Sequence, residues 1–228
     1  MTTLGLIGSG MIGSTVARLA VDAGHDVVLS NSRGPETLAE LVAELGSRAR
    51  AASGAEAAAA GDLVLVSVPL LAYPALPAAA LARKIVMDTG NYYPERDGRI
   101  AALDDRSLTD SEYLLQQVPG ARIVKVFNNI FYKHLQNLAR PAGAGSSSTG
   151  DRTYLPIAGD DAGAKVAVVE FLDSIGYGAV DDGGLADGWR QQPGTPAYGP
   201  PYGEFENEKG TPAGAATIRA ALAAATRM

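Results

Sequence analysis

The chain has 228 residues, of which 46% are hydrophobic and 19% are charged, a composition typical of soluble globular proteins. Its formal net charge of −6 argues against a nucleic-acid partner, because binding to phosphates needs a basic surface. The absence of cysteine excludes disulfides, a thiolate nucleophile and cysteine-ligated metals.

Apolar runs alternate with helical patterns along the chain. Most of these runs are continuous, which is typical of parallel strands buried on both faces. The alternation predicts an α/β fold, a Rossmann-type doubly wound and mostly parallel sheet with a small C-terminal extension. The expected strands are Leu4–Ile7, Asp26–Ser30, Asp62–Val68, Lys84–Thr89, Arg122–Phe127 and Tyr154–Ala158, with a weaker one near Arg48–Ala51.

The segments between the runs predict helices and loops. Apolar residues at helical spacing over 35–46 predict a helix with Pro35 near its start and Gly46 just past its end. Residues 140–152 are small, polar and glycine-rich, which predicts a flexible loop. A segment rich in Pro, Gly and Tyr follows over 193–214, and a helix over roughly 213–226 ends the chain. We expect an NADP-binding domain over 1–140 and a smaller substrate or dimerisation region over 151–228.

Three glycines follow the first expected strand with the spacing G-x-G-x-x-G. Gly8 permits a tight turn, Gly10 allows close approach of a pyrophosphate, and Gly13 allows close packing of helix and strand. Amide groups at the N-terminus of the following helix would face the phosphates. The alternative, an ordinary glycine-rich turn, is disfavoured by the matching strand, helix and second strand. The expected phosphate loop is Gly8, Ser9, Gly10, Met11, Ile12 and Gly13.

The second expected strand ends without a carboxylate, in the sequence Asn31-Ser32-Arg33. An enzyme that uses NAD usually has Asp or Glu here to bind the ribose hydroxyls. Asn31, Ser32 and Arg33 would instead donate hydrogen bonds to a 2′-phosphate, so the cofactor is expected to be NADP(H). In the alternative interpretation, Arg33 is merely solvated.

Several motifs together resemble the family of coenzyme F420-dependent NADP oxidoreductases. They are GLIGSGMIG and SNSRG near the start, VSVPL at 66–70, KVFNNI at 125–130, IAGDDAGAK at 157–165 and IGYGAVDDGGLADGW at 175–189. The resemblance implies an NADPH-binding reductase of the deazaflavin F420, and members are often dimeric. It also implies cofactor contacts that come after later strands, from Val68, Pro69, Leu70, Thr89, Gly90, Asn91, Lys125 and Asn128.

Other polar and aromatic side chains have both a functional and a structural interpretation. Asn128 can serve the pocket, cap a helix, or do both. Lys125 can reach the pocket or lie along the edge of the sheet. Trp189, the only tryptophan, is more typical of a core than of a cofactor platform. The candidates for a catalytic role, none of them assigned, are Asn128, His134, Trp189, Tyr198 and Tyr202, while Phe205 could help cover a planar ring.

These features predict hydride transfer between NADPH and F420, which requires neither a protein nucleophile nor a metal. A second interpretation is an NADPH-dependent reductase of a small carbonyl or imine, with a tyrosine or His134 as proton donor. A third, of another class, is a non-catalytic NADP(H)-binding regulatory module. We expect a cytoplasmic homodimer without a metal. The uncharged stretch Leu63–Ala82 is broken by prolines, and we expect no membrane helix there.

Overall fold

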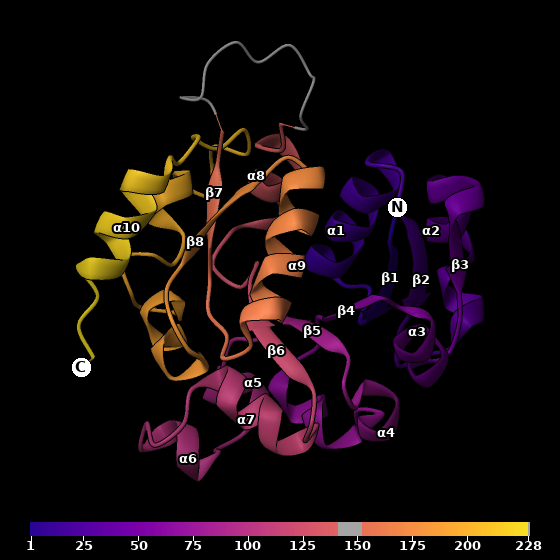
Figure 1. Ribbon diagram of the computed structural model, residues 1–228, viewed down its shortest axis with the longest axis horizontal. Coiled ribbons are helices and arrows are strands. Elements are labelled where there is room, and N and C mark those ends of the chain that lie inside the picture. Colours follow the sequence, from indigo (N-terminus) through magenta and orange to yellow (C-terminus); the bar gives the residue numbers. More distant parts are fainter. Residues whose placement is uncertain (141–151, 228) are drawn as a thin grey trace.

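Six parallel strands form the central sheet, in the order β3-β2-β1-β4-β5-β6 (Figure 1). The structure is a computed structural model that describes residues 1–140 and 152–227. The chain order reverses between β1 and β4, and such a switch point opens a crevice at the carboxyl ends of the strands. The strands are β1 (Thr3–Ile7), β2 (Asp26–Ser30), β3 (Ala49–Ala51), β4 (Leu63–Val66), β5 (Ile85–Asp88) and β6 (Arg122–Lys125).

Helices connect these strands and cover both faces of the sheet. The expected helix over 35–46 is a 3₁₀ turn, η1 (Pro35–Leu38), that continues into α2 (Ala39–Leu45). The other α-helices are α1 (Met11–Asp22), α3 (Gly54–Ala60), α4 (Ala78–Leu81), α5 (Pro94–Asp97), α6 (Ala101–Asp104), α7 (Asp110–Gln117), α8 (Tyr132–Asn137), α9 (Ala162–Ser174) and α10 (Ala215–Ala223). The remaining 3₁₀ helices are η2 (Gly46–Arg48), η3 (Leu70–Ala75), η4 (Leu185–Gln191) and η5 (Pro200–Tyr202).

A second, two-stranded parallel sheet consists of β7 (Tyr154–Ile157) and β8 (Gly178–Asp181). It joins the edge of the central sheet through one antiparallel bridge, in which the backbones of Lys125 and Ala158 exchange two hydrogen bonds. This bridge holds the C-terminal segment beside the end of β6. The sequence predicts β7, whereas β8 has no continuous apolar run and was not predicted.

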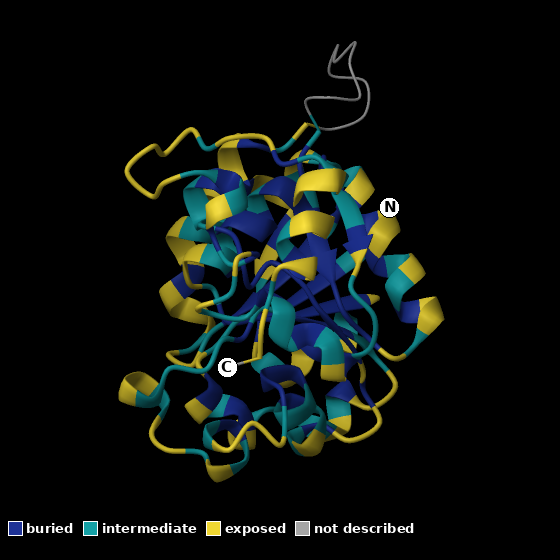
Figure 2. Cartoon of the chain, turned by 90° about the vertical axis from the view of Figure 1, so that its left-hand side faces the viewer, coloured by how far each residue is buried: buried dark blue, intermediate teal, exposed yellow. Residues whose placement is uncertain are grey.

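The two largest buried clusters of the described residues lie on the two faces of the central sheet. One contains apolar residues of α1, α2, α8 and α9 and extends over β7, β8 and α10. The other contains residues of η3, α4 and α7. Figure 2 shows the buried strands at the centre, with the exposed positions on the surrounding helices and loops. Because one cluster contains residues from both the 1–140 and the 152–227 segments, the C-terminal segment packs directly on the sheet.

The predicted α/β class and Rossmann-type topology are confirmed. The terminal helix is shorter than expected, since α10 begins at Ala215 and ends at Ala223. Residues 141–151 of the predicted loop lie outside the described residues. Within residues 1–140 and 152–227, no helix has the length and apolar character needed to cross a bilayer.

Candidate active site

A cavity of about 500 Å³ opens at the carboxyl ends of β1, β4, β5 and β6. Its wall is made by the first turn, by the loops after β4 and β5, by the segment after β6, and by three residues of the C-terminal segment. The lining residues are Gly10, Met11, Ile12, Ser67, Val68, Pro69, Thr89, Gly90, Asn91, Tyr93, Arg96, Phe127, Asn128, Asn129, Ile130, Phe131, Tyr132, Tyr198, Gly199 and Phe205. Open α/β sheets bind ligands at this position.

The three glycines of the first turn have three different surroundings. Gly8 has φ +102°, and a Cβ there would collide with the carbonyl oxygen of Ser67. A Cβ on Gly13 would collide with the carbonyl oxygen of Gly8. Gly10 is exposed at the N-cap of α1, with no atom within 4 Å of where its Cβ would be. Two glycines are therefore required by the fold, and Gly10 keeps space open at the helix N-terminus, where a pyrophosphate fits.

The end of β2 is fixed by short polar contacts. The Ser30 hydroxyl donates to the Leu6 carbonyl oxygen at 2.6 Å. The side chain of Asn31 accepts a hydrogen bond from the Arg33 amide at 2.9 Å and donates one to the Thr37 hydroxyl at 2.8 Å. Ser32 and Arg33 are exposed. Two side chains that can donate to a phosphate thus stand at the position where NAD enzymes carry a carboxylate.

The loops after β4 and β5 meet at the cavity. The Thr89 hydroxyl donates to the Ser67 hydroxyl at 3.1 Å and lies 3.3 Å from the Val66 carbonyl oxygen. Val68, Pro69, Thr89, Gly90 and Asn91 line the cavity, as the expected cofactor contacts should. Leu70 does not line it, because its side chain is fully buried in the cluster under η3.

The turn after β6 brings two asparagines to the cavity. Phe127 has φ +64°, an unusual conformation for a non-glycine residue, and its side chain is fully buried. The Asn128 amide donates to the Asn91 side chain at 3.0 Å, and the Asn91 amide donates to the Asn128 carbonyl oxygen at 2.7 Å. This reciprocal pair joins the loops after β5 and β6, so Asn128 has a positioning role besides lining the cavity.

Lys125 does not line the cavity. Its side chain is fully buried, and its ammonium group donates to the Gly90 carbonyl oxygen at 2.7 Å. The expected direct contact between Lys125 and the cofactor therefore has no support in this geometry. The lysine contacts the cavity only indirectly, through its hydrogen bond to Gly90, which lines it.

Aromatic side chains of the C-terminal segment close the cavity. The Tyr198 and Tyr93 hydroxyls are 2.5 Å apart, and burial together with this contact raises the pKa of Tyr198 above its ordinary value. The ring of Phe205 packs edge-on against Phe131, with 5.3 Å between the ring centroids. Arg96 lies over the Tyr93 ring, 5.0 Å from its centroid. The segment over 193–212 thus contacts both sides of the cavity opening.

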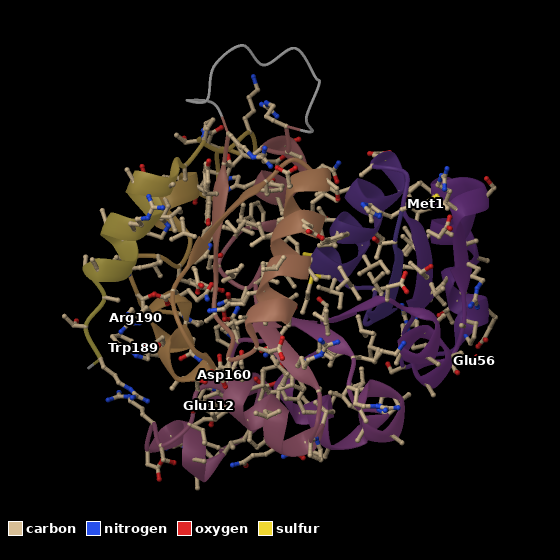
Figure 3. The ribbon with its side chains drawn as sticks, in the orientation of Figure 1. Met1, Glu56, Glu112, Asp160, Trp189 and Arg190 are labelled. Atoms are coloured by element: carbon tan, nitrogen blue, oxygen red, sulfur yellow. The ribbon has the colours of Figure 1, made fainter. Side chains whose placement is uncertain are left out.

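Three other candidates lie outside the cavity. The hydroxyl of Tyr202 is buried between the Asn129 amide and the Tyr154 carbonyl oxygen. His134 is buried and bonded to the Asn207 carbonyl oxygen at 2.8 Å. Trp189 and Arg190 lie side by side near the C-terminal end of the chain (Figure 3), and Trp189 lines a smaller cavity elsewhere. These side chains hold the C-terminal segment in place.

Sequence reasoning missed several residues of the wall. Tyr93, Arg96, Phe131 and Tyr132 follow strands by more residues than the usual contact positions do. Their aromatic or basic character next to Asn91 and Asn129 was the available signal. Among the residues that the structure describes, no group of three His, Asp or Glu side chains is arranged to hold a metal ion.

Comparisons with solved structures agree with this fold. A hypothetical protein from Sinorhizobium meliloti shares 29% identity, covers 85% of this chain and 91% of its own, and has a TM-score of 0.70. A proposed F420-dependent NADP-reductase from Arthrobacter sp. FB24 shares 24% identity over 81% of this chain and 86% of its own, with a TM-score of 0.65. A 1-pyrroline-5-carboxylate reductase from Streptococcus pyogenes shares 14% identity over 79% of this chain and 57% of its own, with a TM-score of 0.55.

Fold, glycine turn and cavity together define a Rossmann-type NADP-dependent oxidoreductase. Residues 3–92 match the family model described as NADP oxidoreductase, coenzyme F420-dependent. This match confirms the resemblance read from the sequence over β1 to β5 and the start of the following loop.

Proposed function

We propose that this protein transfers a hydride between NADPH and the deazaflavin F420. The observation that carries the proposal is one continuous cavity, which begins at the phosphate-binding turn and ends under the aromatic side chains of the C-terminal segment. Its volume of about 500 Å³ suits the nicotinamide end of a dinucleotide and one flat ring against it. The family match over residues 3–92 supports the same pair of reactants.

Each part of the wall has a role in this reaction. The amides at the start of α1 would hold the pyrophosphate, and Ser32 and Arg33 would hold the 2′-phosphate. Val68, Thr89 and Asn91 would border the nicotinamide ring. Tyr93, Tyr198 and Phe205 would exclude water and face the ring of the acceptor. Close approach and orientation are the protein's contribution, because hydride transfer between two carriers needs no protein nucleophile.

The atoms of the reaction balance without a further reactant. NADPH supplies a hydride to a ring carbon of oxidised F420 and becomes NADP⁺. Solvent supplies one proton to the ring system, which completes the reduced deazaflavin. Among the described residues that line the cavity, none is a carboxylate or a histidine.

A second candidate function rests on the tyrosine pair. Tyr93 and Tyr198 present two bonded hydroxyls to the cavity, 2.5 Å apart. Such a pair could donate a hydrogen bond, and then a proton, to the oxygen or nitrogen of a small carbonyl or imine. The fold is shared with a pyrroline-carboxylate reductase, which is a precedent for the scaffold only.

Absorbance spectroscopy separates these functions. Loss of the absorbance of oxidised F420 when NADPH is added supports the first proposal. NADPH consumption with a cyclic imine or a small carbonyl compound, but not with F420, supports the second. Binding of NADPH without turnover of any of these acceptors contradicts both and favours a non-catalytic NADP(H)-binding module.

A further inference from the structure

Three charged side chains are buried together behind the cavity wall: Asp88, Asp110 and Lys125, called here the charged cluster. Asp88 and Lys125 end neighbouring strands, β5 and β6, and both side chains are fully buried. Asp110 begins α7. The Lys125 ammonium lies 3.7 Å from the Asp88 carboxylate and 3.9 Å from that of Asp110. Burying charges is costly, and apolar residues of similar volume are often at least as stabilising, so stability alone does not account for the cluster.

The hydrogen bonds of the cluster converge on Gly90, a residue of the cavity wall. The Asp88 carboxylate accepts a bond from the Gly90 amide at 2.8 Å, and the Lys125 ammonium donates one to the Gly90 carbonyl oxygen at 2.7 Å. Both polar groups of this residue are therefore held by buried charges. Tyr73 and Ser111 donate to the same carboxylate at 2.9 and 2.6 Å, which fixes its orientation.

The constraint extends from Gly90 to the open cavity. A Cβ at position 90 would collide with the Tyr73 hydroxyl, so the backbone lies directly on the cluster. Asn91 follows immediately and forms the reciprocal pair with Asn128. Asn128 also donates to the Gln191 carbonyl oxygen at 2.7 Å, which links this wall to the C-terminal segment. A displacement of the Gly90 peptide would move Asn91 and Asn128, which both line the cavity.

We propose that Lys125 and Asp88 are positioning residues, which hold the Gly90–Asn91 backbone in the position that orients the nicotinamide ring. This inference rests on the proposed NADP-dependent function. Neither side chain touches the cavity, so neither is a catalytic residue. The effect on hydride transfer follows from the steep dependence of such reactions on the approach of the two carbon atoms.

The test replaces Lys125 with methionine, which keeps the length and apolar stem and removes the bond to Gly90. NADPH affinity should stay within about threefold of the unmodified protein, because the phosphate-binding turn is untouched, while kcat should fall at least about tenfold. Lys84→Met is the matched control. Lys84 donates to the carbonyl oxygens of Ala59 and Gly61, away from the cavity, so its loss should leave kcat unchanged.

A double variant keeps the proposal testable if Lys125→Met alone fails to fold. Lys125→Met leaves two buried carboxylates without their cation, whereas the double variant Lys125→Met with Asp88→Asn removes one charge of each sign. The double variant should show the same fall in kcat, because the Gly90 carbonyl oxygen is again without its donor. Unchanged kcat in a folded variant, or an equal fall in Lys84→Met, would overturn the proposal.

The emission of bound NADPH gives a readout that does not need the acceptor. The nicotinamide of NADPH is fluorescent, and a less restrained ring should show lower emission and anisotropy in Lys125→Met at saturating protein. If the unmodified protein binds NADPH but reduces no acceptor, the proposed function fails, while the emission still tests the positioning. Identical emission and anisotropy in the unmodified protein and Lys125→Met would refute the positioning role.

Discussion

The three glycines of the first turn differ in whether the fold requires a glycine at their position. Gly8 and Gly13 are needed for the chain to pass close to the Ser67 and Gly8 carbonyl groups. Gly10 has open space around it, so the fold itself does not require a glycine there. This difference separates a requirement of folding from a requirement of binding, and it can be tested one position at a time.

We predict that Gly10→Val folds normally and loses NADPH binding. The branched side chain would enter the free space at the N-terminus of α1, where the pyrophosphate is expected. Titration by calorimetry measures the affinity, and thermal unfolding measures the stability. Gly214→Val is the control, since Gly214 is also an N-cap glycine with open surroundings but lies far along the chain, before α10. Undiminished affinity in Gly10→Val would rule out the turn as the phosphate site.

Arg33 sets the expected preference for NADPH over NADH. Loss of a charge-assisted phosphate contact costs about 1.5–3 kcal/mol, so Arg33→Ala should weaken NADPH binding and leave NADH binding nearly unchanged. Parallel titrations with both cofactors make the comparison. Arg219→Ala, at an exposed position of α10, should change neither affinity. Equal affinity of the unmodified protein for the two cofactors would contradict this role of Arg33.

At the level of elements, the segment over 193–212 combines two functions that its composition does not separate. Tyr198 lines the cavity, whereas Tyr202, four residues further, is fully buried between β7 and the turn after β6. The 3₁₀ helix η5, which ends at Tyr202, turns the chain from the cavity into the core. One segment therefore both lines the cavity, through Tyr198, and packs into the core, through Tyr202.

Removing one hydroxyl at each position distinguishes these roles. Tyr202→Phe removes the hydrogen bond that the buried Tyr202 hydroxyl donates to the Tyr154 carbonyl oxygen and should lower the free energy of unfolding by about 1–2 kcal/mol. Tyr198→Phe should change stability little and raise the apparent KM for the second substrate about threefold or more, through the lost hydrogen bond. Thermal unfolding and steady-state kinetics on both variants decide. A loss of stability without a kinetic change in Tyr198→Phe would remove this segment from the site.

The order of elements was predictable where the pattern is long. Apolar runs indicated five of the central strands, a weaker run near Arg48–Ala51 indicated β3, and the run at Tyr154 indicated β7. The strand β8 escaped prediction because Gly178–Asp181 is short and carries a glycine and a charge within four residues. Its extended form depends on pairing with β7, which is a contact distant in sequence.

The direction of side chains was not predictable from position along the chain. Leu70 and Lys125 are both expected cofactor contacts, yet both side chains are fully buried and neither lines the cavity. Conversely, the left-handed turn at Phe127 directs the segment that follows it, including Phe131, to the cavity wall. A local sequence pattern predicts where a strand ends, but it does not predict the backbone dihedral angles of the residues that follow.

For the molecule as a whole, the buried Asp110 predicts a dependence of stability on pH. Burial raises the pKa of Asp110 to about 6 from the ordinary 3.8, although Lys125 opposes this shift and Asp88 and Asp97 favour it. Between these two values the folded state binds more protons than the unfolded state, so this group's contribution to stability falls as pH rises from about 4 to about 6.

The Asp110→Asn variant should remove that dependence. Relative to the unmodified protein, its melting temperature should increase as pH rises from about 4 to about 7, because the unmodified carboxyl ionises over this range. Thermal unfolding at closely spaced pH values measures the difference. Asp22→Asn, at an exposed position of α1, is the control and should show a constant difference. A difference in Asp110→Asn that does not vary with pH would show that Asp110 is not perturbed.

A single cavity shared by the glycine turn and the C-terminal segment has a consequence for the order of ligand arrival. The cofactor must reach the loops after β4 and β5, and an acceptor already under Tyr198 and Phe205 would obstruct its nicotinamide end. We therefore expect a compulsory-order mechanism in which NADPH binds first and NADP⁺ leaves last. Inhibition by NADP⁺ should be competitive against NADPH and noncompetitive against the acceptor, whereas competition against both substrates would indicate random entry.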